Sequence, residues 1–218
     1  MKRVLILVEG QTEEKFVNDV LIPGFSQKGL YCIPVLATTK RVKIGSDFKG
    51  GIVSYQKTKN DILRLLQDTN AIVVTTMIDY YGFSSLVPFR ASIKGINCFE
   101  RVMSLEALFK NDINHDKFLP YLQLHEFEAM VFVSPKEAAE ALTEVRKVAD
   151  VEKVKQQFHS PEEINDNPTT TPSKRLENIF HSYEKPLHGP LITKRIGLDN
   201  IRKECKHFND WCTTLENL

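Results

Sequence analysis

This 218-residue chain has few cysteines and no long apolar run, and each absence excludes a class of protein. It has four cysteines, Cys32, Cys98, Cys205 and Cys212, and no C-x-x-C pair. This spacing predicts neither a disulfide framework nor a zinc knuckle. No apolar run is long enough to span a bilayer, and Glu9 interrupts the first run too early for a secretory signal. We therefore expect a cytoplasmic protein without membrane contact.

The chain also lacks an excess of charge of either sign. Its 29 Lys and Arg residues nearly balance 28 Asp and Glu residues, which gives a net charge of +1. No global field attracts nucleic acid, so any basic surface has to be local. The G-x-x-x-x-G-K-[ST] loop of P-loop ATPases and the G-x-S-x-G motif of α/β-hydrolases are absent as well.

Apolar residues, 42% of the chain, are arranged as alternating strands and helices. Continuous apolar runs predict four strands, at 4–8, 30–36, 71–78 and 118–124. Helical spacing predicts helices at 12–21, 52–66, 99–109 and 135–149. We therefore predict an α/β fold over residues 1–150, with a mostly parallel four-stranded sheet flanked by helices. Pro34 predicts an edge strand or a bulge. We expect residues 151–218 to form a helical C-terminal extension, which Phe208 and Trp211 anchor to the core.

Acidic residues follow the ends of three predicted strands. Glu9 follows the first, Asp79 the third, and Glu126 and Glu128 the fourth. A single strand-end acid is commonly solvated or caps a helix, but Glu9 and Asp79 occupy matching positions. In open parallel sheets the carboxyl ends of the strands border the ligand crevice, where these two acids meet if their strands are neighbours. Clustered carboxylates need a cation, and their hard oxygens select Mg²⁺ or Mn²⁺.

Four segments together resemble the DUF4276 family of uncharacterised prokaryotic proteins, which is grouped with Toprim-like folds. They are VEGQTEEKF, MIDYYGF, LHEFEAMVF and PSKRLENIF…HG…IGLDNIRKECKHFNDW. The resemblance implies a Toprim-like fold, whose motif is a Glu after the first strand and Asp-x-Asp after a later one. Glu9 matches the Glu and Asp79 the first Asp, but Tyr81 replaces the second Asp. Either Glu126 or Glu128 supplies the missing metal ligand, or metal binding is weaker, or catalysis is lost.

A basic segment near the C-terminus predicts phosphate contacts. Lys174 and Arg175 lie at a predicted helix start, where backbone N–H groups attract anions. His188 and Arg195 are further candidates for binding phosphate or substrate. The alternatives are a solvated helical face, or neutralisation of the acidic residues by Arg175 or Arg195 when no metal is bound.

These observations leave three functional hypotheses open. The first is a Mg²⁺- or Mn²⁺-dependent phosphodiesterase or nuclease, with Glu9, Glu13, Asp79 and Lys174 in catalysis. Similarity to nuclease partners of ATPases in phage-defence cassettes implies a nucleic-acid substrate and an ATPase partner. The second is a non-catalytic nucleic-acid-binding or regulatory subunit with a degenerate Toprim site. The third is a small-molecule phosphohydrolase or nucleotidyl-transferring enzyme that uses the same crevice.

Overall fold

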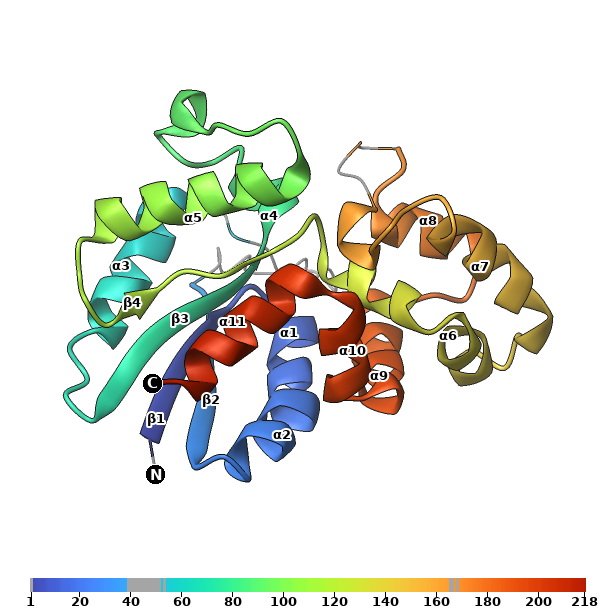
Figure 1. Ribbon diagram of the computed structural model, residues 1–218, viewed down its shortest axis with the longest axis horizontal. Helices are drawn as coiled ribbons and strands as arrows, with labels where there is room; N and C mark the ends of the chain where they lie inside the picture. The colour runs from blue at the N-terminus through green and yellow to red at the C-terminus, as the bar shows by residue number, and fades with distance from the viewer. Residues whose placement is uncertain (1, 39–51, 53, 165–166, 168) are drawn as a thin grey trace, which may run out of the picture.

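The N-terminal part of the chain forms a parallel β-sheet flanked by helices (Figure 1). The computed structural model describes residues 2–38, 52, 54–164, 167 and 169–218. Within these residues five strands pair in parallel, in the order β2-β1-β3-β4, with β5 also paired to β3. They are β1 (Lys2–Val8), β2 (Leu30–Leu36), β3 (Ala71–Asp79), β4 (Phe118–Leu119) and β5 (Leu122–Gln123). The predicted mostly parallel α/β sheet is therefore confirmed.

Two prolines lie where the sheet ends or is interrupted: Pro34 in an edge strand and Pro120 between two short strands. Pro34 lies in β2, which forms one edge and pairs with β1, so the missing N–H removes no bond from a central ladder. The strand predicted at 118–124 forms only the short strands β4 and β5, with Pro120 between them. Beside this interruption, the Thr76 hydroxyl accepts from Tyr121 N at 3.0 Å and donates to Tyr121 O at 2.8 Å. A side chain thus replaces the missing ladder bonds.

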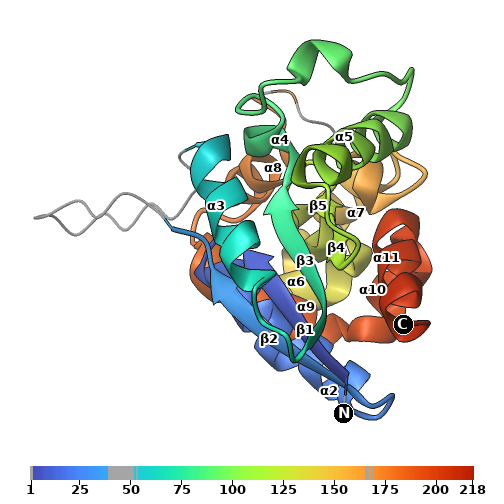
Figure 2. The same cartoon turned by 90° about the vertical axis from the view of Figure 1, so that its left-hand side faces the viewer.

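Helices cover both faces of the sheet. In β1 Val4, Ile6 and Val8 belong to one buried cluster, whereas Leu5 and Leu7 belong to the other. This alternation is typical of a strand buried on both faces. The first face is covered by α1 (Gln11–Phe16), the π-helix η1 (Val17–Leu21), α2 (Ile22–Ser26) and α11 (Lys206–Glu216). The second face is covered by α3 (Tyr55–Leu65) and α5 (Cys98–Ile113), and Figure 2 shows α3 and α11 on opposite sides of β3.

The other helices are mostly short and lie between β3 and α11 in the chain. They are α4 (Tyr80–Phe83), η2 (Arg90–Ser92), η3 (Phe127–Val133), α6 (Pro135–Ala141), η4 (Val145–Lys147), α7 (Val148–Lys155), η5 (Pro161–Glu163), α8 (Pro172–Ile179), α9 (Lys185–Ile196) and α10 (Leu198–Glu204). The helix predicted at 135–149 is interrupted at Thr143, whose φ of 57° is incompatible with a continuing right-handed helix. None of the described helices combines the length and apolar character needed to cross a membrane.

The C-terminal helix α11 is tied to the sheet by aromatic side chains, as predicted. Trp211 stacks on Tyr121, with ring centroids 4.3 Å apart, and its Nε1 donates to Thr75 Oγ1 at 2.9 Å. Phe208 is fully buried and contacts Phe16 of α1. Residues from the C-terminal part of the chain therefore share one core with β1 and α1.

A buried carboxylate fixes the start of α11. Glu162 accepts hydrogen bonds from His207 N and Phe208 N, each at 2.9 Å, and so satisfies the free N–H groups of the helix. Burial raises the pKa of Glu162, and these two bonds oppose that rise. His207 also reaches Glu106 of α5, with Nε2 3.1 Å from Oε2. These contacts join α11 to α5 and η5.

We expect Trp211→Ala to lower the free energy of unfolding by about 3–5 kcal/mol, because it leaves a cavity and an unpaired Thr75 hydroxyl. Urea denaturation followed by far-UV circular dichroism measures the loss. Leu187→Ala is the control, since Leu187 is 54% exposed and its truncation should change stability by less than about 0.5 kcal/mol. Equal losses in the two variants would contradict the anchoring role of Trp211.

Candidate functional site

The acids at the ends of β1 and β3 lie side by side. The two strands are parallel neighbours, with Val8 opposite Met77, so Glu9 and Asp79 reach the same edge of the sheet. Asp79 N donates to Glu9 Oε2 at 3.0 Å. The juxtaposition expected from the strand pattern is therefore present in the structure.

Three more carboxylates join them, and we call the five together the acidic cluster: Glu9, Glu13, Asp79, Glu126 and Glu128. Each of three further hydrogen bonds ties a carboxylate oxygen of the cluster to a backbone N–H group. Gly10 N donates to Glu13 Oε2 at 2.8 Å, Phe127 N donates to Asp79 Oδ1 at 2.8 Å, and Ser173 N donates to Glu126 Oε2 at 3.0 Å. The acids thus hold the loops and helix starts that surround them.

The acidic cluster is too crowded and too buried to ionise fully. Burial, followed by repulsion from Glu9 and Glu13, raises the pKa of Asp79 well above its ordinary value. Burial likewise raises the pKa of Glu9 and of Glu128, with repulsion from Glu126 as an additional cause for both. Burial and repulsion from Glu9 raise the pKa of Glu13 to about 8, so Glu13 carries a proton at neutral pH.

Lys185 provides positive charge inside the acidic cluster. Its Nζ lies 3.0 Å from Glu128 Oε2 and 4.0 Å from Glu126 Oε1. Its charge lowers the pKa of Glu9, Asp79 and Glu128, in opposition to their burial. Burial alone would lower the pKa of Lys185, but the attraction of the acids raises it above the ordinary value. Lys185 is not among the residues that the sequence pattern predicts for the site.

Close packing holds the helix that carries Lys185. Gly189 of α9 has no side chain, and a Cβ there would lie 3.2 Å from Phe127 Cε1 and 3.3 Å from the Tyr183 hydroxyl. Lys15 of α1 also donates from Nζ to Pro186 O at 2.9 Å. The start of α9 is therefore fixed against α1 and η3, which both carry residues of the acidic cluster.

The predicted basic site at the start of α8 is arranged differently from the expectation. Thr171 caps the helix by accepting from Lys174 N at 3.4 Å, and the N–H of the preceding residue, Ser173, donates to Glu126. A carboxylate of the protein therefore occupies the helix start at which a phosphate was expected. The Lys174 side chain is 53% exposed and pairs with Glu177 at 2.6 Å.

The other predicted basic residues make contacts away from the acids of the cluster. Arg175 donates from Nε to Thr170 O at 2.8 Å, with its guanidinium over the Phe158 ring. Arg195 binds Glu137 at 2.8 Å and Glu140 at 3.2 Å, so the hypothesis that Arg195 neutralises the acidic cluster is wrong.

His188 also contacts its own helix start, where its Nδ1 accepts from Glu184 N at 2.8 Å. The cation that approaches Glu128 is instead Lys185, three residues before His188. The sequence offered no signal that distinguishes Lys185 from the other lysines, because its importance depends on where α9 packs.

The side chains of the acidic cluster are of the type that binds a divalent cation, but their positions in this structure do not form a shared coordination site. Carboxylate oxygens are the ligands that Mg²⁺ and Mn²⁺ prefer, and the raised pKa values favour the arrival of positive charge. However, in the part of the chain that the structure describes, no group of three or more His, Cys, Asp or Glu side chains is arranged to hold one ion. One oxygen of each acid accepts from a backbone N–H group or lies beside Lys185, and side-chain rotation has to bring the remaining oxygens together around one ion.

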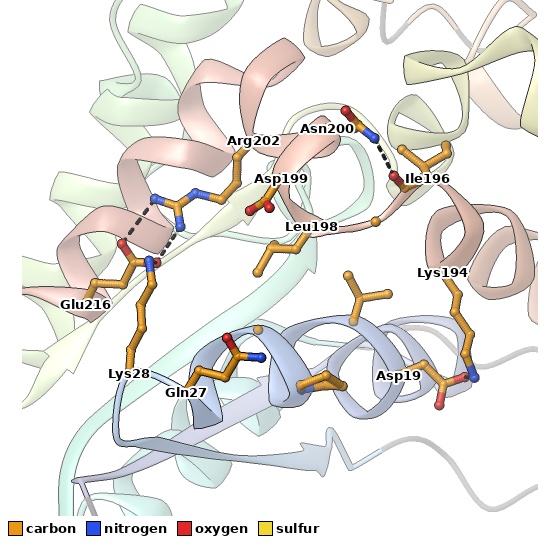
Figure 3. Close-up of a pocket in the computed structure, with 14 residues that line it drawn as sticks. Asp19, Gln27, Lys28, Lys194, Ile196, Leu198, Asp199, Asn200, Arg202 and Glu216 are labelled. Carbon is orange, nitrogen blue, oxygen red and sulfur yellow. Dashed lines mark hydrogen bonds and ion pairs between the residues drawn. The ribbon is translucent and has the colours of Figure 1, made fainter.

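A separate pocket of about 580 Å³ lies between α2 and the helices α9 and α10 (Figure 3). None of its lining residues belongs to the acidic cluster. Its charged groups are largely engaged with one another: Lys28 and Arg202 both bind Glu216, and Lys194 lies 3.5 Å from Asp19. We therefore assign the candidate site to the acidic cluster rather than to this pocket.

Comparison with protein families gives a match over nearly the whole chain. The family model described as Domain of unknown function (DUF4276) matches residues 8–216. Neither the curated proteins nor the solved structures compared with this chain gave a match. The family description assigns no activity, so function has to be argued from the site.

We expect the stability of the protein to fall as the pH rises from about 5 to about 8. The folded pKa of Glu13, about 8, lies above its ordinary value of 4.5, so the folded state binds this proton more tightly than the unfolded state. The stabilisation is therefore complete below pH 4.5 and is lost on approaching pH 8, at up to about 1.4 kcal/mol per pH unit. Glu13→Gln should reduce this dependence.

Urea denaturation of both proteins between pH 5 and pH 8 measures the difference. Glu14→Gln is a matched control on the same helix and should keep the wild-type dependence. Identical pH profiles for wild type and Glu13→Gln would refute the raised pKa of Glu13.

Proposed function

The chain belongs to the DUF4276 family, a domain family of unknown function, and we propose that it is a Mg²⁺- or Mn²⁺-dependent phosphodiesterase or nuclease of Toprim-like type. One observation carries the proposal: the acidic cluster lies at the carboxyl edge of the parallel sheet, with Asp79 N bound to Glu9 Oε2 at 3.0 Å. Ligands of open α/β sheets bind at this edge. Carboxylates whose pKa values are raised by burial and by each other are also typical of functional sites.

Glu9 and Asp79 would hold the cation through the oxygens that do not bind backbone N–H groups, and Glu126 or Glu128 would complete the set. A bound divalent cation supplies charge that stabilises a phosphoryl-transfer transition state and activates water. Burial and repulsion from Glu9 raise the pKa of Glu13, which favours a proton that Glu13 could donate as a general acid to a leaving oxygen. Lys174, exposed at the start of α8, would contact a neighbouring backbone phosphate.

The wider setting of this activity is also a proposal. The resemblance implies a nuclease that works with an ATPase partner in phage defence, and we propose that it does so in the cytoplasm. Cleavage is therefore best measured with the chain alone and again in the presence of a candidate ATPase.

Three observations favour a second function, a non-catalytic nucleic-acid-binding or regulatory subunit. Lys185 already supplies a cation to Glu128, at 3.0 Å, and no three candidate ligands converge within the described residues. Tyr81 also stands where the Toprim motif has its second Asp. In this alternative the acidic cluster is structural, and the protein binds no divalent cation at the site.

Cleavage of plasmid DNA and of RNA with MgCl₂ or MnCl₂ tests the proposed enzyme. Glu9→Gln and Asp79→Asn should each lower the rate by about 100-fold, because both remove a ligand charge. Both variants keep an oxygen that can accept the native backbone hydrogen bond, so the fold should survive. Glu152→Gln and Asp116→Asn, at exposed positions, should retain activity.

Activity that survives in the Glu9→Gln/Asp79→Asn double variant would exclude this site as the catalytic centre. Calorimetric titration with MnCl₂ separates the two functions. The enzyme predicts binding that Glu9→Gln abolishes, whereas the regulatory subunit predicts no binding.

A further inference from the structure

Lys185 lies within the acidic cluster, and the function proposed above gives it no role. We propose that Lys185 is a resident counter-ion: its ammonium group holds Glu128 in the metal-free protein and has to leave that carboxylate before the cluster binds a divalent cation. This inference rests on the proposed function, because it describes how the same site exchanges one cation for another.

The charge balance at the site supports this exchange. Glu128 is buried, with only 1% of its side chain exposed, and its Oε2 lies 3.0 Å from Lys185 Nζ. Without Lys185, the buried carboxylate of Glu128 has no close cation among the described residues, and such a loss is strongly destabilising, so the ammonium leaves only if another cation replaces it. Lys185 carries a single positive charge, whereas a divalent cation would balance two of the carboxylates that ionise in the cluster. A cation that enters the cluster therefore competes with Lys185 for the same oxygens.

The geometry of α9 allows the ammonium group to move without disturbing the helix. Lys185 is the first residue of α9, and 39% of its side chain is exposed. The backbone around it is fixed, because Pro186 O accepts from Lys15 Nζ and His188 N donates to Glu184 O at 2.8 Å. The flexible four-carbon stem of lysine can therefore rotate toward solvent while α9 stays in place.

The hydroxyl of Tyr183, two residues before Lys185 in the chain, supports a ligand at the cluster. The Tyr183 hydroxyl is buried and has no hydrogen-bond partner among the described residues. Burial raises the pKa of this hydroxyl well above its ordinary value, and repulsion from Glu128 and Glu126 adds to the rise. Buried polar groups without partners are rare in folded proteins, so a ligand or a water molecule is expected at this position.

Amine labelling of the wild-type protein tests the exchange directly. Reductive methylation, followed by peptide mass spectrometry, reports how accessible each lysine is with and without MnCl₂. We expect Mn²⁺ to raise the labelling rate of Lys185 several-fold, since the released ammonium group faces solvent. Lys194 is the matched control on the same helix: it pairs with Asp19 outside the cluster, and its rate should not change. An unchanged or lower rate at Lys185 under conditions where Mn²⁺ binds would overturn the inference.

Calorimetric titration of Lys185→Gln with MnCl₂ gives a second measurement. Without a competing ammonium group, this variant should bind Mn²⁺ roughly tenfold more tightly than wild type, whereas Lys194→Gln should match wild type. Equal or weaker binding by Lys185→Gln, with binding by wild type intact, would overturn the counter-ion role and leave the proposed function standing. Absence of Mn²⁺ binding in all three proteins would instead refute the metal-dependent function, and the exchange with it.

Discussion

Parallel pairing between β1 and β3 is the interaction on which the candidate site depends. It brings Glu9 and Asp79, 70 residues apart in the chain, to a contact of 3.0 Å between Asp79 N and Glu9 Oε2. The pairing is secured on both faces, because the side chains of β1 alternate between two buried clusters. A shift of one residue between these strands would reverse those faces and separate the two carboxylates.

The acidic cluster is part of the scaffold as well as a candidate site. Its carboxylates bind the N–H groups of Gly10, Asp79, Phe127 and Ser173, which belong to segments far apart in the sequence. Lys185 adds the start of α9 to the same network. The repulsion among these groups is therefore offset by hydrogen bonds that organise the fold. Such a site stores unfavourable electrostatic energy, which an arriving cation would relieve.

The strands predicted from the apolar pattern match the strands of the structure in most of the sheet. The two differ where a single residue interrupts a strand or a helix. The runs in β1, β2 and β3 were predictable because buried parallel strands need continuous apolar sequence. Pro120 divides the strand expected at 118–124, and Thr143 ends α6 early through its positive φ. At the start of α8 the expected anion is a carboxylate of the protein, that of Glu126. Short-range spacing cannot anticipate which distant group fills a helix start.

The sequence by itself determined the parallel α/β class and the positions of Glu9 and Asp79 at the carboxyl ends of two of its strands. These follow from hydrophobic periodicity and from the direction of parallel strands, which are local properties. Only the tertiary structure decided that Lys185, rather than Arg195, supplies charge to the acids, and that Glu13 is buried enough to stay protonated. Those outcomes depend on how α9 and α1 pack at the edge of the sheet, because Coulomb interactions and burial act through space rather than along the chain.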